Sequence, residues 1–470
     1  MTSVRNRASA SAIAAAVALV VGVPSAQAAA INAAGTWVGA DGTQSWDVGT
    51  NWSTSPDHPS GDAAAVTFNT GAASRSVQVN VGVTVPSITI NATSNFSNNI
   101  QVGTSGVLTF DAVGAGPATF TTTGTGTANN SISVAMVLTD SLVANVNQVP
   151  GNSTSGSLTL GGAMSGPGGF TKNGAGLLTV STSNKTYLGP TVMNGGRIRL
   201  SVAGNTTGTS SYTVNNGAQL TPIASGTFRF GPLATGVLNL NGTGLGAGSH
   251  PGDFPGAIRP DTGFDVVIDS NVFLQSDSLV HSQANAGVGS ITFPREIGGP
   301  GRLTFTAPNS NTSLGTLNLT ADNSYSGGTT INGGNLVVSG ATADLGSGNV
   351  EVKNIIAGAN ARLTISAGVA NAIGDLATLS LEGGGTGGVA DQGYAVLGAG
   401  INDTIAGLTL GGVVQTLGGT YGSSASSATF QNDEFFSGLG VVTLAIPEPT
   451  DLALLGLGAA GLLARRRGSR

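Results

Sequence analysis

The sequence predicts an all-β protein whose strands are wound into a solenoid. Three observations support this fold class: short segments of alternating apolar and polar residues, glycine-rich turns between them, and a larger unit that recurs along the chain. There are 75 glycines in 470 residues, 40% of the residues are hydrophobic and only 9% are charged. Disordered chains typically combine low hydrophobicity with high charge, so this composition favours an ordered, turn-rich fold.

The alternating segments are short, and each is bounded by Gly, Asn, Ser or Pro. Their two-residue period is that of a β-strand with one buried and one exposed face. No long segment with a helical period lies between the two ends of the chain. Clear examples are residues 157–160, 197–200, 237–240, 317–319, 336–338 and 408–410.

The larger unit occurs in two clear copies. Residues 158–171 match residues 291–304, and residues 176–198 match residues 315–336. Asn-Gly and Gly-Gly pairs supply corners with positive φ, and the segments between them supply strands. One such coil cannot bury its inner face alone, so coils must stack and share one core.

This unit resembles the autotransporter-associated β-strand repeat, also called the passenger-associated transport repeat. The resemblance rests on residues 317–334 and on residues 178–196, where Lys185 is inserted and Pro190 replaces a glycine. It implies a right-handed parallel β-helix on an exported protein. Stacked β-sandwiches or jelly rolls are the alternative folds, because short alternating strands fit those too.

The first residues predict a secretory signal peptide. Arg5 and Arg7 precede an uncharged apolar run, residues 10–23, and Ala26-Gln27-Ala28 offers small residues for cleavage near Ala28. This is the order of a secretory signal. We therefore expect the general secretion machinery as a partner.

The last residues predict a sorting tail. Pro447-Glu448-Pro449 is followed by an apolar run, residues 452–464, and then by Arg465, Arg466 and Arg467. As a helix this run covers about 20 Å, less than the roughly 30 Å of a hydrocarbon core. It therefore suits transient rather than lasting insertion.

The tail resembles the PEP-CTERM sorting signal of Gram-negative bacteria, whose family is processed by an exosortase, a membrane protease. The resemblance implies passage through the inner membrane to the cell envelope, the outer surface or the medium.

The expected organisation has five parts. A signal peptide (residues 1–28) precedes a β cap module (29–110) that contains all three tryptophans, Trp37, Trp46 and Trp52. A β-solenoid (111–410) follows, with repeats clearest at 158–200 and 291–340. Closing strands (411–445) lead into the sorting signal (446–470).

Composition excludes several partners and cofactors. Without residues 1–28 and 447–470 the chain has 11 basic and 21 acidic residues, a net charge of about −10. An acidic chain without a basic patch is a poor partner for nucleic acid. Because cysteine is absent and the three histidines are far apart in sequence, neither a structural zinc site nor a thiol nucleophile is expected. We expect no cofactor.

Two groups of residues are candidates for a site. Asp261, Asp265 and Asp269 are spaced by four residues, so a strand would place them on one face. Carboxylates on such a face could serve a polysaccharide lyase or hydrolase, although a solvated outer face is the favoured interpretation. The three tryptophans form either an end cap for the solenoid or a platform that contacts glycans.

These observations predict an exported, non-catalytic protein of the cell surface or extracellular matrix, with a structural or adhesive role and exopolysaccharide as a partner. The alternatives are a carbohydrate-active β-helix enzyme, which would use the acidic residues, and a glycan-binding module, which would use the tryptophans.

Overall fold

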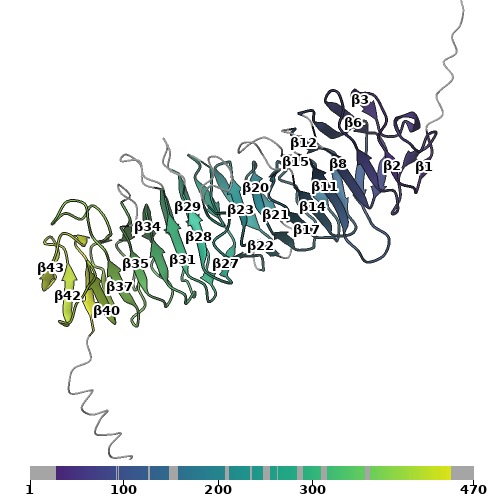
Figure 1. Ribbon diagram of the computed structural model, residues 1–470. Helices are drawn as coiled ribbons and strands as arrows, with labels where there is room; N and C mark the ends of the chain where they lie inside the picture. Colours follow the sequence, from purple (N-terminus) through teal and green to yellow (C-terminus); the bar gives the residue numbers. More distant parts are fainter. Residues whose placement is uncertain are drawn as a thin grey trace, which may run out of the picture.

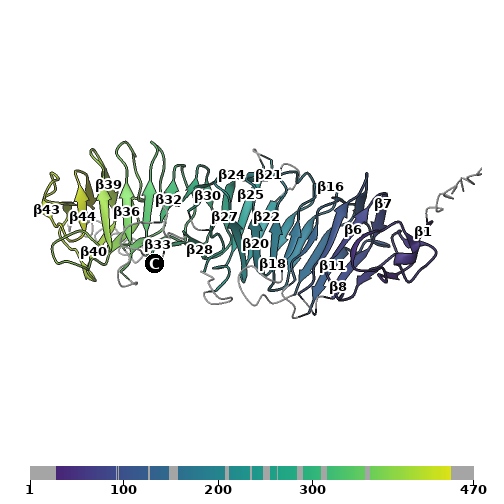
Figure 2. The ribbon, with the colours of Figure 1, turned by 90° about the horizontal axis from the view of Figure 1, so that it is seen from above.

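The computed structural model describes residues 28–91, 93, 95–124, 128–147, 157–206, 211–232, 235–246, 255–261, 263–282, 289–307, 315–354 and 360–445. The predicted all-β solenoid is confirmed: these residues form a long rod of stacked coils, which runs from β1 at one end to β43 at the other (Figures 1 and 2). Within the described residues the only helix is η1, the single 3₁₀ turn Gly49–Asn51. No helix in this part of the chain is long and apolar enough to cross a bilayer.

Each complete coil passes through three faces in turn, and its strands pair in parallel with those of the neighbouring coils. Face 1 is one sheet of 11 strands. Its strands are β2 (Gly35–Thr36), β5 (Val66–Phe68), β8 (Ser87–Asn91), β11 (Ala118–Thr123), β14 (Leu142–Val146), β17 (Phe170–Asn173), β19 (Thr191–Met193), β22 (Ser211–Asn215), β25 (Val237–Asn241), β27 (Asn271–Leu274) and β30 (Ile297–Gly298).

Face 2 consists of an eight-stranded and a seven-stranded sheet, which Ile258 joins by parallel bridges to Leu220 on one side and Val280 on the other. The first sheet contains β3 (Gly42–Ser45), β6 (Arg75–Val79), β9 (Asn98–Val102), β12 (Asn130–Ile132), β15 (Leu158–Leu160), β18 (Leu177–Val180), β20 (Gly196–Leu200) and β23 (Ala218–Pro222). The second contains β28 (Ser278–His281), β31 (Leu303–Thr306), β33 (Thr329–Ile331), β35 (Val350–Val352), β37 (Thr378–Leu381), β40 (Gly407–Leu410) and β41 (Val413–Val414).

Face 3 holds the third strand of each coil. In the first coils it is a four-stranded sheet of β7 (Gly82–Val85), β10 (Val107–Phe110), β13 (Ala135–Leu138) and β16 (Met164–Ser165). In the later coils it is a nine-stranded sheet of β21 (Gly204–Thr206), β24 (Gly226–Phe230), β26 (Val266–Ile268), β29 (Ser290–Phe293), β32 (Thr316–Leu319), β34 (Asn335–Val338), β36 (Arg362–Ile365), β38 (Tyr394–Leu397) and β44 (Phe436–Gly438).

Small sheets close the two ends. At the first end β1 (Ala30–Ile31) pairs with β4 (His58–Pro59). At the other end a four-stranded sheet contains β39 (Asn402–Ile405), β42 (Gly419–Gly422), β43 (Phe430–Gln431) and β45 (Val441–Leu444). Here β42 runs antiparallel to β45, and β41 runs antiparallel to β40, so the parallel winding of the coils ends.

One continuous core fills the rod. Along the strands buried apolar residues alternate with outward polar ones, as in β11, where Ala118 and Phe120 are buried between outward threonines. Equivalent positions stack from coil to coil, for example Ala118, Leu142 and Phe170 on face 1. The cluster of packed buried residues extends from Trp37 to Leu444, so each coil gains its stability from its neighbours.

Hydrogen bonding is continuous across residues 110 and 410, the expected limits of the solenoid. Face 1 is a single sheet from β2 to β30 and crosses residue 110 without a break. At the other end β39 pairs with β45 across residue 410. The segments on either side of residues 111–410 therefore share sheets with the solenoid.

The recurring sequence unit is one complete coil. In the first copy β18 pairs with β20, so Leu178 lies opposite Ile198 on face 2. In the second copy β32 pairs with β34, so Leu317 lies opposite Leu336 on face 3. The two copies therefore begin on different faces.

Inside the unit a buried tyrosine is tied to a buried threonine four residues later. The Tyr187 and Thr191 hydroxyl oxygens lie 2.6 Å apart, and those of Tyr325 and Thr329 are also 2.6 Å apart. Each pair lets a hydroxyl sit in the core without losing its hydrogen bond.

A buried carboxyl near the closing strands gives a pH-dependent prediction. Asp403 is 1% exposed and accepts hydrogen bonds from the Ala372 and Ile373 amides at 3.0 and 3.2 Å. Burial raises its pKa from 3.8 to about 6. The contribution of Asp403 to stability is therefore complete below pH 3.8 and is lost as the pH rises to about 6.

We expect Asp403→Asn, which keeps an acceptor for both amides, to be more stable than the native protein at pH 7 by about 2 kcal/mol, with little difference at pH 4. Urea denaturation at the two pH values measures this. A stability difference that does not change with pH would contradict it.

Candidate functional site

The outer surface of face 1 is uncharged. Lys172 is the only charged residue in its strands from β2 to β27, and its side chain is buried inside the coil. The outward positions carry Thr, Ser, Asn and Val, with Phe273 at the far end. In a chain with a net charge of −6, this gives the rod one long neutral face with many hydrogen-bonding groups.

A single column of polar side chains runs along this face. Strand register places Thr36, Thr67, Thr89 and Thr121 opposite one another and then continues into asparagines. The asparagines are Asn145, Asn173, Asn194, Asn215 and Asn241.

In the asparagine part of the column each Nδ2 donates to the Oδ1 of the preceding asparagine, over 3.1, 2.8, 2.7 and 3.2 Å. At the beginning Asn145 donates to the Thr121 hydroxyl over 3.3 Å. At the end Asn241 accepts from the Ser276 hydroxyl over 3.0 Å. We call this chain, from Thr121 to Ser276, the asparagine ladder.

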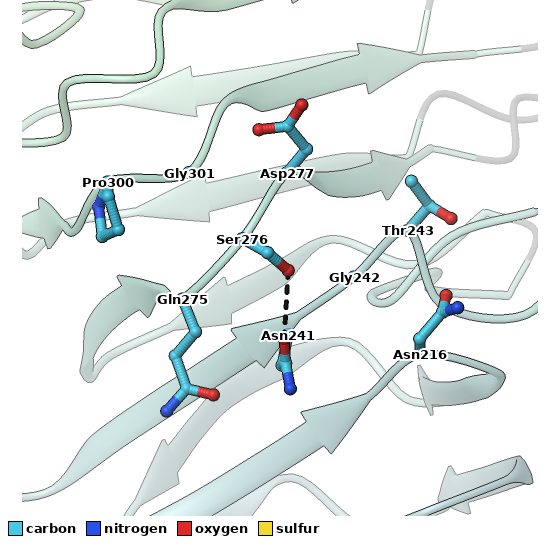
Figure 3. A pocket seen from close by; sticks show the side chains of 9 residues that line it. All are labelled: Asn216, Asn241, Gly242, Thr243, Gln275, Ser276, Asp277, Pro300 and Gly301. Atoms are coloured by element: carbon cyan, nitrogen blue, oxygen red, sulfur yellow. Dashed lines mark hydrogen bonds between the residues drawn. The ribbon is translucent and has the colours of Figure 1, made fainter.

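A groove of about 490 Å³ lies where the asparagine ladder ends (Figure 3). Its walls come from the corners that follow β22, β25, β27 and β30, so it crosses successive coils along the axis of the rod. The polar side chains that line it are Asn216, Asn241, Thr243, Gln275, Ser276 and Asp277. Asp277 also accepts the Arg302 backbone amide at 2.9 Å.

Two glycines in the lining of the groove lie too close to the neighbouring coil to carry a side chain. A Cβ at Gly301 would lie 2.2 Å from the Ser276 carbonyl oxygen, and a Cβ at Gly242 would lie 2.7 Å from the Asn216 Cβ. Gly242 also has a φ of +106°, which disfavours any other residue. The groove therefore depends on close packing between the corners of adjacent coils.

The three aspartates of the candidate acidic face bind different partners. Asp265 and Asp269 flank β26 on its outward side, whereas the Asp261 amide bonds to the Pro222 carbonyl at the end of β23. Asp261 contacts Arg199 at 2.7 Å, and Asp265 accepts from the Ser290 amide and hydroxyl at 3.0 and 2.8 Å.

Asp269 forms ion pairs with Arg229 and Arg295. These hydrogen bonds to two arginines hold the pKa of the Asp269 carboxyl below its usual value, against the opposing effect of burial. Each of the three carboxylates thus has a partner that stabilises its charge. Among the described residues no group of three or more His, Asp or Glu could hold a metal ion.

The three tryptophans lie in the core rather than on the surface. Trp37, Trp46 and Trp52 are 3%, 0% and 1% exposed, and they pack on one another and on Phe68. Trp46 donates to the Pro59 carbonyl and Trp52 to the Trp46 carbonyl. No indole face is open to a sugar.

The sequence-predicted processing sites lie mostly outside the described residues. Ala26 and the sorting residues Pro447, Glu448, Pro449, Arg465, Arg466 and Arg467 are in segments that the structure does not describe, as is the predicted C-terminal apolar helix. Ala28, the last residue of the predicted signal peptide, is the first described residue and directly precedes the N-terminal end of the rod.

Fold and surface together define a parallel β-solenoid with a neutral polar face and a groove. The model of the passenger-associated transport repeat matches residues 170–200 and 312–338, and that of the PEP-CTERM protein-sorting motif matches residues 445–467. The chain thus carries both the repeat and the sorting motif that its sequence resembles. Comparison with curated proteins gave no match, and comparison with solved structures gave none either.

The sorting motif indicates an exported protein, processed by an exosortase-type membrane protease and sorted through the cell envelope. The repeats are typical of surface repeat proteins, and neither matched family is a catalytic one.

Sequence reasoning missed the asparagine ladder and its groove. A signal was present: at four consecutive turns of face 1 an asparagine ends the strand or directly follows it, and a glycine comes next or after one residue. These asparagines are Asn173, Asn194, Asn215 and Asn241. From sequence, Asn-Gly pairs were interpreted as corners of the coils. Their alignment depends on strand register, which places them at the same position in successive coils.

Proposed function

We propose that the protein is a non-catalytic structural or adhesive component of the outer cell surface or extracellular matrix, associated with exopolysaccharide. The observation that supports this most directly is the single rod, in which one core joins all coils and one neutral face runs along most of the length. A rigid, repetitive surface suits many weak contacts with a polymer. The paired aspartates on faces 2 and 3 agree with a non-catalytic role.

In this proposal the signal peptide directs export from the cytoplasm of a Gram-negative bacterium. The C-terminal segment, residues 452–464, then inserts transiently into the inner membrane with its arginines on the cytoplasmic side. The exosortase-type protease cuts near Pro447-Glu448-Pro449 and releases the rod toward the outer surface.

Intact-mass measurement of the native protein in each cell fraction tests this. We expect a species that lacks residues 1–28 and the segment after the Pro-Glu-Pro motif, in the outer surface or medium fraction. The triple variant Pro447→Ala, Glu448→Ala, Pro449→Ala should instead retain the tail and stay in the inner membrane. A native protein that keeps residues 452–470 in the inner membrane would refute sorting to the surface, and release of product from incubated polysaccharides would refute the non-catalytic role.

A further inference from the structure

The neutral face and the groove together have the chemistry of a binding site for a hydroxyl-rich polymer. An amide side chain carries two donor hydrogens and an acceptor oxygen with two lone pairs. Each central asparagine of the ladder uses one donor and one acceptor position within the ladder. The others are available to a ligand, and they repeat at the strand spacing of about 4.8 Å.

An exposed aromatic ring lies beside the groove. Phe273 points outward from β27 and is 41% exposed, and Gln275, which lines the groove, is two residues further along the same strand direction. Strand register places Phe273 opposite Asn239, in the outward column adjacent to the asparagine ladder. A large apolar ring at such a position is a stacking surface for the C–H face of a sugar.

The charges on this surface disfavour an anionic ligand. The outward side chains of face 1 from β2 to β27 include no cation that could neutralise an anionic polymer or a nucleic acid. Asp277 in the groove would repel an anionic chain. Apart from Phe273, the site offers no cluster of large apolar or aromatic anchors of the kind that dominates the energy of protein–protein interfaces.

We propose that this surface, from Asn194 to Phe273 with the groove at its end, binds a neutral linear polysaccharide that lies along the axis of the rod. Phe273 stacks on one sugar ring, the groove residues Gln275 and Thr243 bind its hydroxyls, and the asparagine ladder binds the hydroxyls of the following sugars. This inference rests on the proposed function, since it identifies the class of exopolysaccharide with which a surface rod would associate.

The test is titration calorimetry of the full secreted protein with cellohexaose, laminarihexaose, maltohexaose and mannohexaose, and with alginate as an anionic polymer. At least one neutral oligosaccharide should bind, and alginate should not. Phe273→Ala and Gln275→Ala should each weaken that binding about ten-fold, an effect of about 1.4 kcal/mol.

The matched control is Asn318→Asp on face 3. Asn318 is also an outward asparagine whose Nδ2 bonds to a side chain of the adjacent strand, the Thr292 hydroxyl, at 3.2 Å. We expect this variant to bind as the native protein does, whereas Asn215→Asp, which puts a negative charge in the ladder, should bind several-fold more weakly. The thermal midpoint of each variant is measured alongside. Because Gln275 points outward, Gln275→Ala is the variant whose folding should be least affected.

The inference is wrong if none of the neutral oligosaccharides binds, if alginate binds best, or if Phe273→Ala and Gln275→Ala bind like the native protein. A mature surface protein that binds none of them would leave the proposed function standing. A protein retained in the inner membrane would refute the proposed function whatever it binds.

Discussion

Replacing Gly327 with alanine should destabilise the solenoid by about 3 kcal/mol, the upper part of the range for overpacking. A Cβ at this position would lie 2.3 Å from the Gly301 carbonyl carbon and 2.4 Å from the Arg302 nitrogen of the preceding coil. Both atoms belong to the backbone and are fixed by the parallel pairing of β31 with β33. The coils would have to separate at this corner, so the neighbouring core would lose packing as well.

The matched control is Gly82→Ala. Gly82 begins β7, and an added Cβ there would have no atom within 4 Å. Thermal unfolding followed by circular dichroism should show a midpoint several degrees lower for Gly327→Ala and no loss for Gly82→Ala. Equal midpoints would mean that the corners of adjacent coils can move apart freely.

Raising the pH from 7 to about 10 should stabilise the native protein relative to a Lys172→Met variant. Lys172 is 0% exposed, and its Nζ donates to the carbonyls of Asn173, Gly174 and Gly195 at 3.2, 2.6 and 2.8 Å. Burial lowers its pKa from 10.5 to about 7. Between these values the unfolded chain binds a proton that the native protein does not, so native stability rises with pH.

The slope reaches at most about 1.4 kcal/mol per pH unit, because a single proton is involved. The three carbonyls favour the charged form and so oppose the effect of burial on the pKa of Lys172. Urea denaturation of both proteins at pH 7, 8 and 9 gives the difference between their free energies of unfolding. The titration of all other groups contributes equally to both proteins and cancels in this difference. Lys172→Arg keeps its charge over this range, so it should lack the rise and be less stable than the native protein at each pH. A native-minus-variant difference that stays constant would contradict the prediction.

The repeats and the fold class could be predicted because their signals are local. Alternation and corner glycines fix strand and turn, and the repeated unit at 176–198 and 315–336 shows that coils stack. The face on which each strand lies could not be predicted, because it depends on the length of every preceding turn. The first copy begins on face 2 and the second on face 3.

The candidate site was harder to predict, since it depends on which residues of different coils become neighbours. Asp261 and Asp265 are four residues apart, yet Asp261 pairs with Arg199, 62 residues earlier, and Asp265 binds Ser290, 25 residues later. The tryptophans were recognised as a group, but their burial follows from packing on Phe68. To predict the asparagine ladder, one would need to know the register of six consecutive face 1 strands, from β11 to β25.

The recurring unit is one complete coil, whichever face it starts on. One unit can therefore be added or removed without changing the path of the remaining coils. Duplicating it in a gene would extend the molecule by about 4.8 Å, the separation of adjacent strands, and would leave both ends and their caps unchanged. The length of such a rod could therefore change in small regular steps, without the need to evolve a new core.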